Sequence, residues 1–128
     1  MAEFSNYLEN ALINATLRNT SYTSPTTVYL SLYTSDPTDA DSGTELSGDG
    51  YAREAIAFAA PSNGVSSNSG EITFTASGGS WGSVTHIGIH DASTGGNLLY
   101  HSAMTAAKTI SDGDDLVFAI GSVSVTLA

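Results

Sequence analysis

The composition describes a small acidic chain with enough apolar residues for one core. It has 128 residues, 41% of them hydrophobic, and its 13 acidic and three basic residues give a net charge of −10. A chain of this length forms one domain and is too short for two, so we predict a single domain over residues 1–128. The scarcity of Lys and Arg argues against nucleic acid and anionic membranes as partners, because both are bound through basic side chains.

The sequence has no cysteine, which excludes disulfides and cysteine-bound metals. It does not open with a basic segment followed by an apolar one, and it has no run of about 18 apolar residues. We therefore expect neither a secretion signal nor a membrane span. Stability must come from core packing or from assembly.

Residues 1–19 predict a helical segment. Ser5 is a candidate N-cap, and the Ser24-Pro25 pair favours extended backbone, so the helix must end before Pro25. The apolar stripe packs against the chain's own sheet or docks on a neighbouring subunit, and the sequence leaves both interpretations open. Its residues recur at helical spacings of three and four: Phe4, Tyr7, Leu8, Ala11, Leu12 and Ala15.

Residues 27–33 are rich in β-branched and aromatic side chains and predict a strand with Val28, Leu30 and Leu32 on one face. The polar residues 34–50 that follow contain Pro37, several glycines and five acidic side chains. They predict a long exposed loop, and loops of this length are often functional.

The segment 80–100 predicts a β-hairpin. Thr85, Ile87 and Ile89 share one face of its first strand, residues 91–96 supply turn-forming Asp, Ser, Thr and Gly, and an extended pattern resumes at residue 97. Further strands are predicted at 51–58, 71–75, 104–110, 116–120 and 123–127, with a loop at 61–70 and a turn at 112–115.

About eight short strands after one helix, with no crossover helices between them, predict an all-β fold. We expect an antiparallel β-sandwich over residues 27–128, with a jelly roll as one topology it could adopt. No internal repeat is present.

The chemistry-bearing residues do not form a recognisable site. Asp39 and Asp41 have the spacing of calcium ligands, but Gly43 and Gly50 occupy positions where an EF-hand loop needs ligands. His86 and His90 would share one strand face about 13 Å apart, too far for one metal. Nucleophile-elbow and phosphate-loop motifs are absent. We therefore predict no enzyme activity, no catalytic residue, no metal and no cofactor.

Two residues have both a core and an interface interpretation. Trp81 either seals one end of the sandwich or anchors an interface, and the core is favoured. Arg53 is one of three cations in an acidic chain, so we expect it to pair with a carboxylate of its own chain or of a neighbour.

The order of several motifs resembles a family of small tailed-bacteriophage virion proteins. The resemblance covers nearly the whole chain. Members of that family are labelled tail fibre proteins, and similar small β-sandwiches serve as capsid decoration, or cement, proteins that sit on the shell as trimers. The motifs are residues 4–10, 28–37, Gly50-Tyr-Ala-Arg53, 72–74, Trp81-Gly-Ser-Val-Thr-His86 with its continuation to Ala92, and Gly96-Asn-Leu-Leu-Tyr100.

The resemblance implies a structural role and two alternative locations. In the first, the protein is made in the host cytoplasm and becomes a homotrimeric cement protein on the capsid surface of the virion, stabilising the shell of major capsid protein. In the second, it is a tail fibre or tail-tip component that binds a host receptor or carbohydrate through exposed Tyr29, Tyr33 and Tyr51. The lack of repeats or heptads argues against a fibre shaft, so the cement role is favoured. In either role we expect the interface to draw on Phe4, Tyr7, Leu8, Asp39, Asp41, Glu45, Tyr51, Arg53 and Trp81.

Overall fold

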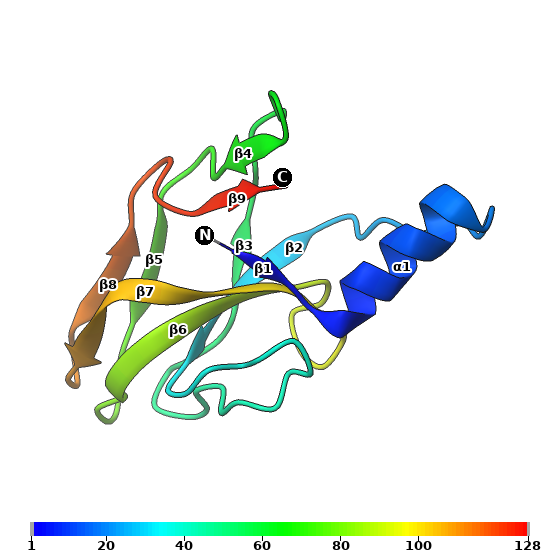
Figure 1. Ribbon diagram of the computed structural model, residues 1–128. Helices are drawn as coiled ribbons and strands as arrows, with labels where there is room; N and C mark the ends of the chain where they lie inside the picture. Colours follow the sequence, from blue (N-terminus) through cyan, green and yellow to red (C-terminus); the bar gives the residue numbers. More distant parts are fainter. Residues whose placement is uncertain (1, 128) are drawn as a thin grey trace.

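A computed structural model describes residues 2–127, so the ends of the predicted domain, residues 1 and 128, lie outside the described part (Figure 1). One helix and nine strands occur within it. In chain order they are β1 (Glu3–Phe4), α1 (Asn6–Leu17), β2 (Val28–Tyr33), β3 (Glu54–Ile56), β4 (Val65–Ser67), β5 (Ile72–Thr75), β6 (Gly82–His90), β7 (Leu98–Ile110), β8 (Asp115–Phe118) and β9 (Ser124–Thr126).

The strands form three antiparallel sheets around one core. The largest has five strands in the order β1-β7-β6-β2-β3, and the pairs β4-β9 and β5-β8 make two smaller sheets. The core includes side chains from all three sheets. This arrangement confirms the predicted all-β sandwich with one N-terminal helix, although it lacks the two four-stranded sheets of a jelly roll.

Alternation along the strands explains the core. In β2, Leu30 and Leu32 are fully buried, as their spacing predicted, and each such burial contributes about 2–3 kcal/mol to folding. In β5, Ile72 and Phe74 are buried while the threonines between and after them are exposed. The ring of Phe74 packs edge-on against Phe118 of the paired strand β8, with ring centroids 5.9 Å apart, so both rings of this small sheet enter the core.

The predicted face of β6 needs one correction. Ile89 is buried in the core as expected, but Val84, which strict alternation puts on the opposite face, is also fully buried there. The pairing of β6 with β7 shifts register between Val84 and His86, so the alternation changes phase within the strand.

Other predicted boundaries change because strand pairing decides them. The separate strands expected at 97–100 and 104–110 are one strand, β7, and the expected strand at 51–58 forms a strand only over β3. The predicted loop at 61–70 contains β4, which is stabilised by pairing with β9. Phe4 belongs to β1 and not to the helix. The antiparallel hairpin of β6 and β7 is confirmed.

Strand β7 is much longer than the strand beside its outer edge. β1 pairs with β7 only through Glu3 with His101 and Phe4 with Tyr100. Among the described strands, none continues along this edge after His101.

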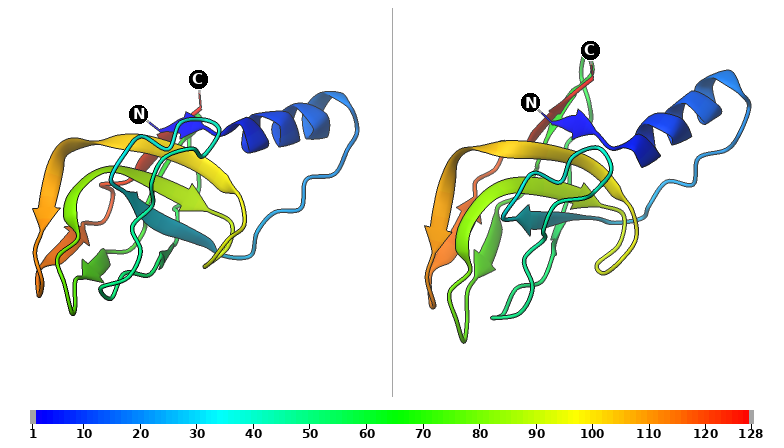
Figure 2. Two further views of the ribbon diagram at one scale, coloured as in Figure 1. Left: turned by 90° about the horizontal axis from the view of Figure 1, so that it is seen from below. Right: turned by 60° about the horizontal axis from the view of Figure 1, so that its bottom comes forward.

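Helix α1 begins at its predicted cap and projects from the β-body (Figures 1 and 2). The Ser5 side chain accepts a hydrogen bond from the Leu8 N–H at 3.1 Å and donates one to the Leu98 carbonyl of β7. Leu8 is the buried side chain of the helix. The chain then returns to the body along residues 18–27. Within the described residues, no helix is both long and apolar enough to cross a membrane.

Candidate functional site

The face of the large sheet that points away from the core is covered by residues 34–50, which we call the covering loop (Figure 2). This face bears the buried polar side chains Ser31 and Tyr33 of β2 and His90 of β6. The loop contributes Pro37, which is fully buried. Polar groups on this face must therefore find hydrogen-bond partners in the sheet or the loop, because they are buried.

A hydrogen-bonded chain joins the covering loop to the sheet. Ser31 Oγ lies 2.9 Å from His90 Nδ1, and the Tyr33 hydroxyl lies 3.3 Å from His90 Nε2 and donates to Asp41 Oδ1 at 2.7 Å. Burial, and then the positive charge of Arg53, lower the pKa of His90, so the imidazole stays neutral at pH 7. Burial, and then the hydrogen bond to Asp41, raise the pKa of Tyr33.

This series of hydrogen bonds includes the residue types of a Ser-His-Asp triad, but its serine is not accessible to a substrate. Ser31 is fully buried. A Cβ atom added to the neighbouring Gly88 would meet Ser31 Oγ at 2.7 Å, so the packing beside the hydroxyl leaves no room for a substrate. The arrangement attaches the covering loop to the sheet and does not expose a nucleophile.

A second connection is the ion pair of Arg53 with Glu45. The guanidinium binds both carboxylate oxygens at 2.8 Å, and its Nη1 also donates to the carbonyls of Ala92 and Gly95 at 2.9 and 2.8 Å. Tyr51 donates to Glu45 at 2.7 Å. Burial opposes ionisation of Glu45, but the hydrogen bonds from Arg53 and Tyr51 outweigh it and lower its pKa. Arg53 therefore pairs within its own chain and ties the covering loop to the 91–96 turn.

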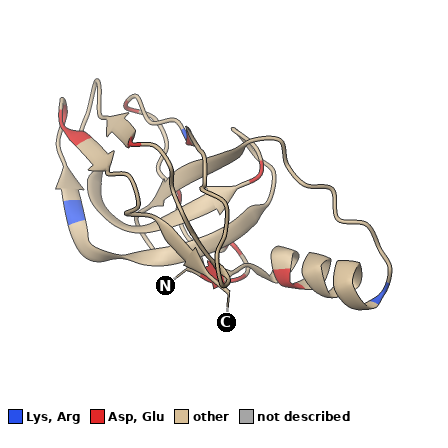
Figure 3. Cartoon of the chain, turned by 90° about the horizontal axis from the view of Figure 1, so that it is seen from above, with Lys and Arg blue, Asp and Glu red and all other residues tan. Residues whose placement is uncertain are grey.

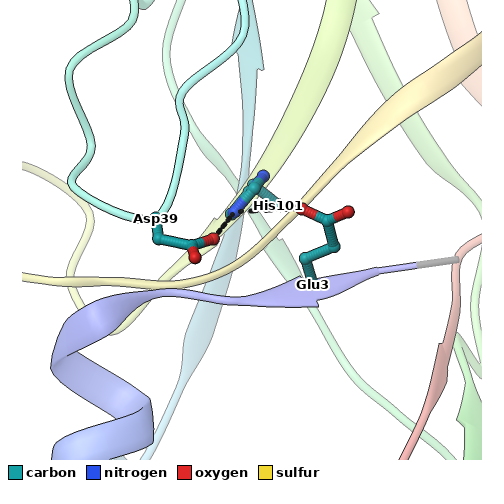
Figure 4. A group of neighbouring side chains, drawn as sticks. All are labelled: Glu3, Asp39 and His101. Atoms are coloured by element: carbon teal, nitrogen blue, oxygen red, sulfur yellow. Dashed lines mark hydrogen bonds and ion pairs between the residues drawn. The ribbon is translucent and has the colours of Figure 1, made fainter.

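A third group lies where β1, the covering loop and β7 meet (Figure 4). His101 is 5% exposed, and its Nε2 lies 2.8 Å from Asp39 Oδ1 and 3.8 Å from Glu3 Oε2. Asp36 Oδ1 lies 3.9 Å from the other ring nitrogen, Nδ1. Residues far apart in the sequence thus place three carboxylates around one buried imidazole.

The helix presents a different surface. Tyr7, Ile13 and Leu17 are 41%, 53% and 79% exposed. Phe4, two residues before the helix begins, packs edge-on against Tyr100 of β7, with ring centroids 5.2 Å apart. We call helix α1 the arm. Its start is therefore fixed to β7, while its far end carries apolar side chains that are exposed to solvent.

The nine predicted interface residues fall into three groups. The covering loop and its supports bring together five of them: Asp39, Asp41, Glu45, Tyr51 and Arg53. Three lie at the start of the arm, where Phe4 and Leu8 contact the body and Tyr7 is exposed. Trp81 lies in the core, 7% exposed, and its Nε1–H donates to the Asp49 carbonyl at 2.9 Å, as the core interpretation predicted.

The exposed receptor-binding aromatics expected in the second alternative need correction. Tyr33 is 1% exposed because the covering loop lies over it. Tyr51 is partly buried and stacks on Phe74, with ring centroids 6.2 Å apart. Neither ring is available for stacking on a ligand. Tyr29 is also partly buried.

Sequence reasoning missed Glu3 and His101. Glu3 lies in a strand too short to leave a pattern, and His101 lies 62 residues from Asp39, so no local spacing connects them. The signal in the sequence was that His101 follows apolar residues at the start of the second hairpin strand.

Two hollows of the described surface adjoin β9. The larger, about 750 Å³, lies between β7 and the strands β8 and β9, and the smaller, about 260 Å³ and mostly apolar, lies near β9 and Leu99. Neither is lined by a carboxylate. An acid–base pair of the kind used in hydrolysis is therefore not found in them.

Basic residues are few and widely separated on the fold, whereas acidic residues are spread over the body and helix (Figure 3). Within residues 2–127, the basic side chains do not line up as a stripe of the kind that follows a phosphate backbone.

Comparison with known proteins adds a family to this description. A family model described as "Podophage GP4 fiber I protein gp80" matches residues 3–126. A search of curated proteins found no match. The description confirms the resemblance to small phage virion proteins labelled as fibre proteins, and it does not mention the capsid. The chain is a structural protein of the phage virion and belongs to the podophage GP4 fiber I protein gp80 family.

Proposed function

We propose that this chain is a non-enzymatic subunit of the phage fiber that assembles as a homotrimer through helix α1. The observation that supports the proposal is the arm itself. A helix of 12 residues extends from the body and leaves Ile13 and Leu17 more than half exposed. The family description supports the fiber location.

A helix of this length is marginally stable alone in water and normally depends on packing of its apolar side. In α1 the first turn has such packing through Leu8, but the last turns do not. A neighbouring copy that covered Ile13 and Leu17 would provide it and would remove apolar surface from water. The helix is thus suited to subunit contact.

The polar groups of the covered face support a non-enzymatic role. Ser31 and His90 are buried and bonded to each other, and Arg53 satisfies two backbone carbonyls as well as Glu45. These groups stabilise the loop, so they are not available to substrate.

The test is the oligomeric state of a double variant, Ile13→Ser with Leu17→Ser. We expect the wild-type chain to form trimers and the variant to be monomeric by size-exclusion chromatography with light scattering. The matched control is Val117→Ser with Ile120→Ser, which removes two similarly exposed apolar side chains from the β-strands and their loop, 49% and 68% exposed. A variant that assembles as well as wild type would contradict the proposal.

Capsid decoration is the second candidate, with the major capsid protein as partner. It is favoured by the architecture, since one β-body without repeats and with a projecting arm is better suited to bridging shell subunits than to extending a shaft. Cryo-electron microscopy of the virion separates the two roles. Density for this chain in the tail fibers would support the first role, and density at local threefold axes of the shell would support the second.

A further inference from the structure

We propose that Glu3, Asp39 and His101 form a binding site for a divalent transition-metal ion, with Zn²⁺ as the representative ion. One nitrogen and two carboxylate oxygens, one from each residue, lie within 4.8 Å of one another. They come from β1, the covering loop and β7, so a bound ion would fasten the N-terminal strand and the loop to the sheet (Figure 4). The site goes beyond the proposed function and does not depend on where the protein lies in the virion.

The distances fit a metal after small movements. Zn²⁺ binds nitrogen and oxygen at about 2.0–2.2 Å, so ligand atoms around a tetrahedral ion lie roughly 3.3–3.5 Å apart. The contact of His101 Nε2 with Asp39 is 2.8 Å and that with Glu3 is 3.8 Å. An ion between them would lengthen the first and shorten the second by about half an ångström each.

A histidine–carboxylate hydrogen bond explains only part of the arrangement. One N–H at Nε2 can donate well to Asp39, which lies at hydrogen-bonding distance, but not also to Glu3 at 3.8 Å. An ion at that nitrogen would engage both carboxylates at once.

The surrounding charge also favours a cation. Three carboxylates, those of Glu3, Asp36 and Asp39, lie within 4 Å of the ring nitrogens of His101. Within residues 2–127, none of the three has an ion pair with Lys or Arg. An excess of negative charge around an imidazole is what a divalent ion neutralises.

The position of the imidazole is largely fixed before any ion binds. His101 is 5% exposed and lies within the paired part of β7, opposite Gly88 of β6 and Glu3 of β1. Asp36 lies 3.9 Å from Nδ1, on the side away from the proposed ion. At that distance Asp36 does not hydrogen-bond to Nδ1, and its Oδ1 accepts from the Thr38 N–H at 2.9 Å, so it adds negative charge near the ring without orienting it.

The ligand set predicts the preference among ions. Imidazole with carboxylates suits Zn²⁺ and other first-row ions, and three protein ligands leave a position for water. We expect Zn²⁺ to bind more tightly than Mn²⁺, and Mg²⁺ to bind weakest, because Mg²⁺ prefers oxygen ligands alone.

The experiment is a titration of chelator-treated full-length protein with ZnCl₂, followed by calorimetric melting and by isothermal titration. One ion per chain and a rise in Tm of about 5–10 °C at 100-fold excess over Kd are expected for wild type. Glu3→Gln tests the site without threatening the fold, because the Glu3 side chain is 71% exposed. It should weaken Zn²⁺ binding at least tenfold, and His101→Gln should abolish the shift.

The matched control is His86→Gln. His86 is a partly buried histidine of β6 whose Nδ1 lies 2.8 Å from the Thr85 hydroxyl, and it is outside the cluster. This variant should bind Zn²⁺ like wild type. The proposal is overturned if ZnCl₂ leaves the wild-type Tm unchanged, or if Glu3→Gln and His101→Gln bind Zn²⁺ as tightly as His86→Gln.

Discussion

The covered face of the sheet and the helical arm are stabilised in opposite ways. Under the covering loop, Arg53, Tyr33 and His90 make hydrogen bonds within the chain, and among the described non-exposed residues no buried side-chain nitrogen or oxygen lacks a partner. In α1, the cap at Ser5 and the burial of Leu8 hold only the first turn. The polar groups under the covering loop therefore find their partners within one chain, whereas the arm keeps apolar side chains exposed to solvent.

This difference separates stability from assembly. Changes under the loop should alter the free energy of unfolding of each chain, because the partners there are internal. Changes at the end of the arm should leave that free energy nearly unchanged and alter only contacts between chains. Four substitutions or conditions test the separation, in order of decreasing effect.

The largest effect is expected from Arg53→Ala. The change leaves Glu45 with Tyr51 as its remaining side-chain donor and removes the side-chain donor of two backbone carbonyls, in a site where the arginine side chain is 9% exposed. It should lower the free energy of unfolding by about 3 kcal/mol. Urea denaturation measures it, with Arg18→Ala on the exposed helix end as the control, expected within about 0.5 kcal/mol of wild type. Equal losses in both variants would contradict an internal role for Arg53.

Ser5→Ala tests the junction between the two regions. Ser5 caps α1 and is bonded to the Leu98 carbonyl, so its loss removes the cap and one attachment of the arm. We expect a loss of about 1–2 kcal/mol and lower helicity by circular dichroism. The exposed Ser24→Ala is the control. If the helicity does not change, the arm does not depend on this cap.

The pH dependence of stability tests the buried histidine. Burial, and then the positive charge of Arg53, lower the pKa of His90 below its ordinary value of 6.5 in the folded state. As the pH falls below that value, the unfolded chain takes up a proton that the folded chain does not, so stability decreases until the folded pKa is passed.

The slope contributed by this one group cannot exceed about 1.4 kcal/mol per pH unit. Melting temperatures between pH 5 and 7.5 measure it, and His90→Gln should flatten the dependence in that range. A variant that keeps the full slope would show that other groups cause it.

The smallest effect on the single chain is expected from Leu17→Ser. Leu17 is 79% exposed, so its replacement should change the free energy of unfolding by less than about 0.5 kcal/mol in dilute, dissociated protein. Chemical denaturation at low concentration measures it. A larger loss would indicate that the end of the arm packs on its own body, which would weaken the contrast between the two regions.

Local chemistry explains which parts of the fold could be predicted from sequence. The helix was predictable because Ser5 supplies a cap and Pro25 a limit, and β2 because Leu30 and Leu32 alternate with polar residues. Strand β4 was missed because its pairing with distant β9, and not its own residues, makes it a strand.

The candidate site was less predictable because it depends on how the covering loop folds. Its acids were recognised as a group, but their partners His90, Arg53 and His101 are assigned only when the loop lies on the sheet. Asp39 and Asp41, which looked like two ligands for one ion, bind different partners, His101 and Tyr33. Tyr33 lost its expected exposure for the same reason.

The unequal lengths of β1 and β7 have a consequence for handling the isolated protein. Since β1 covers only Tyr100 and His101, the edge of β7 from Ala103 to Thr109 is not covered by any described strand. Uncovered strand edges can pair with other chains and promote aggregation, and a lysine on the edge, here Lys108, opposes such pairing. Concentrated preparations of the chain should therefore tolerate changes in the arm better than neutralisation of this single lysine.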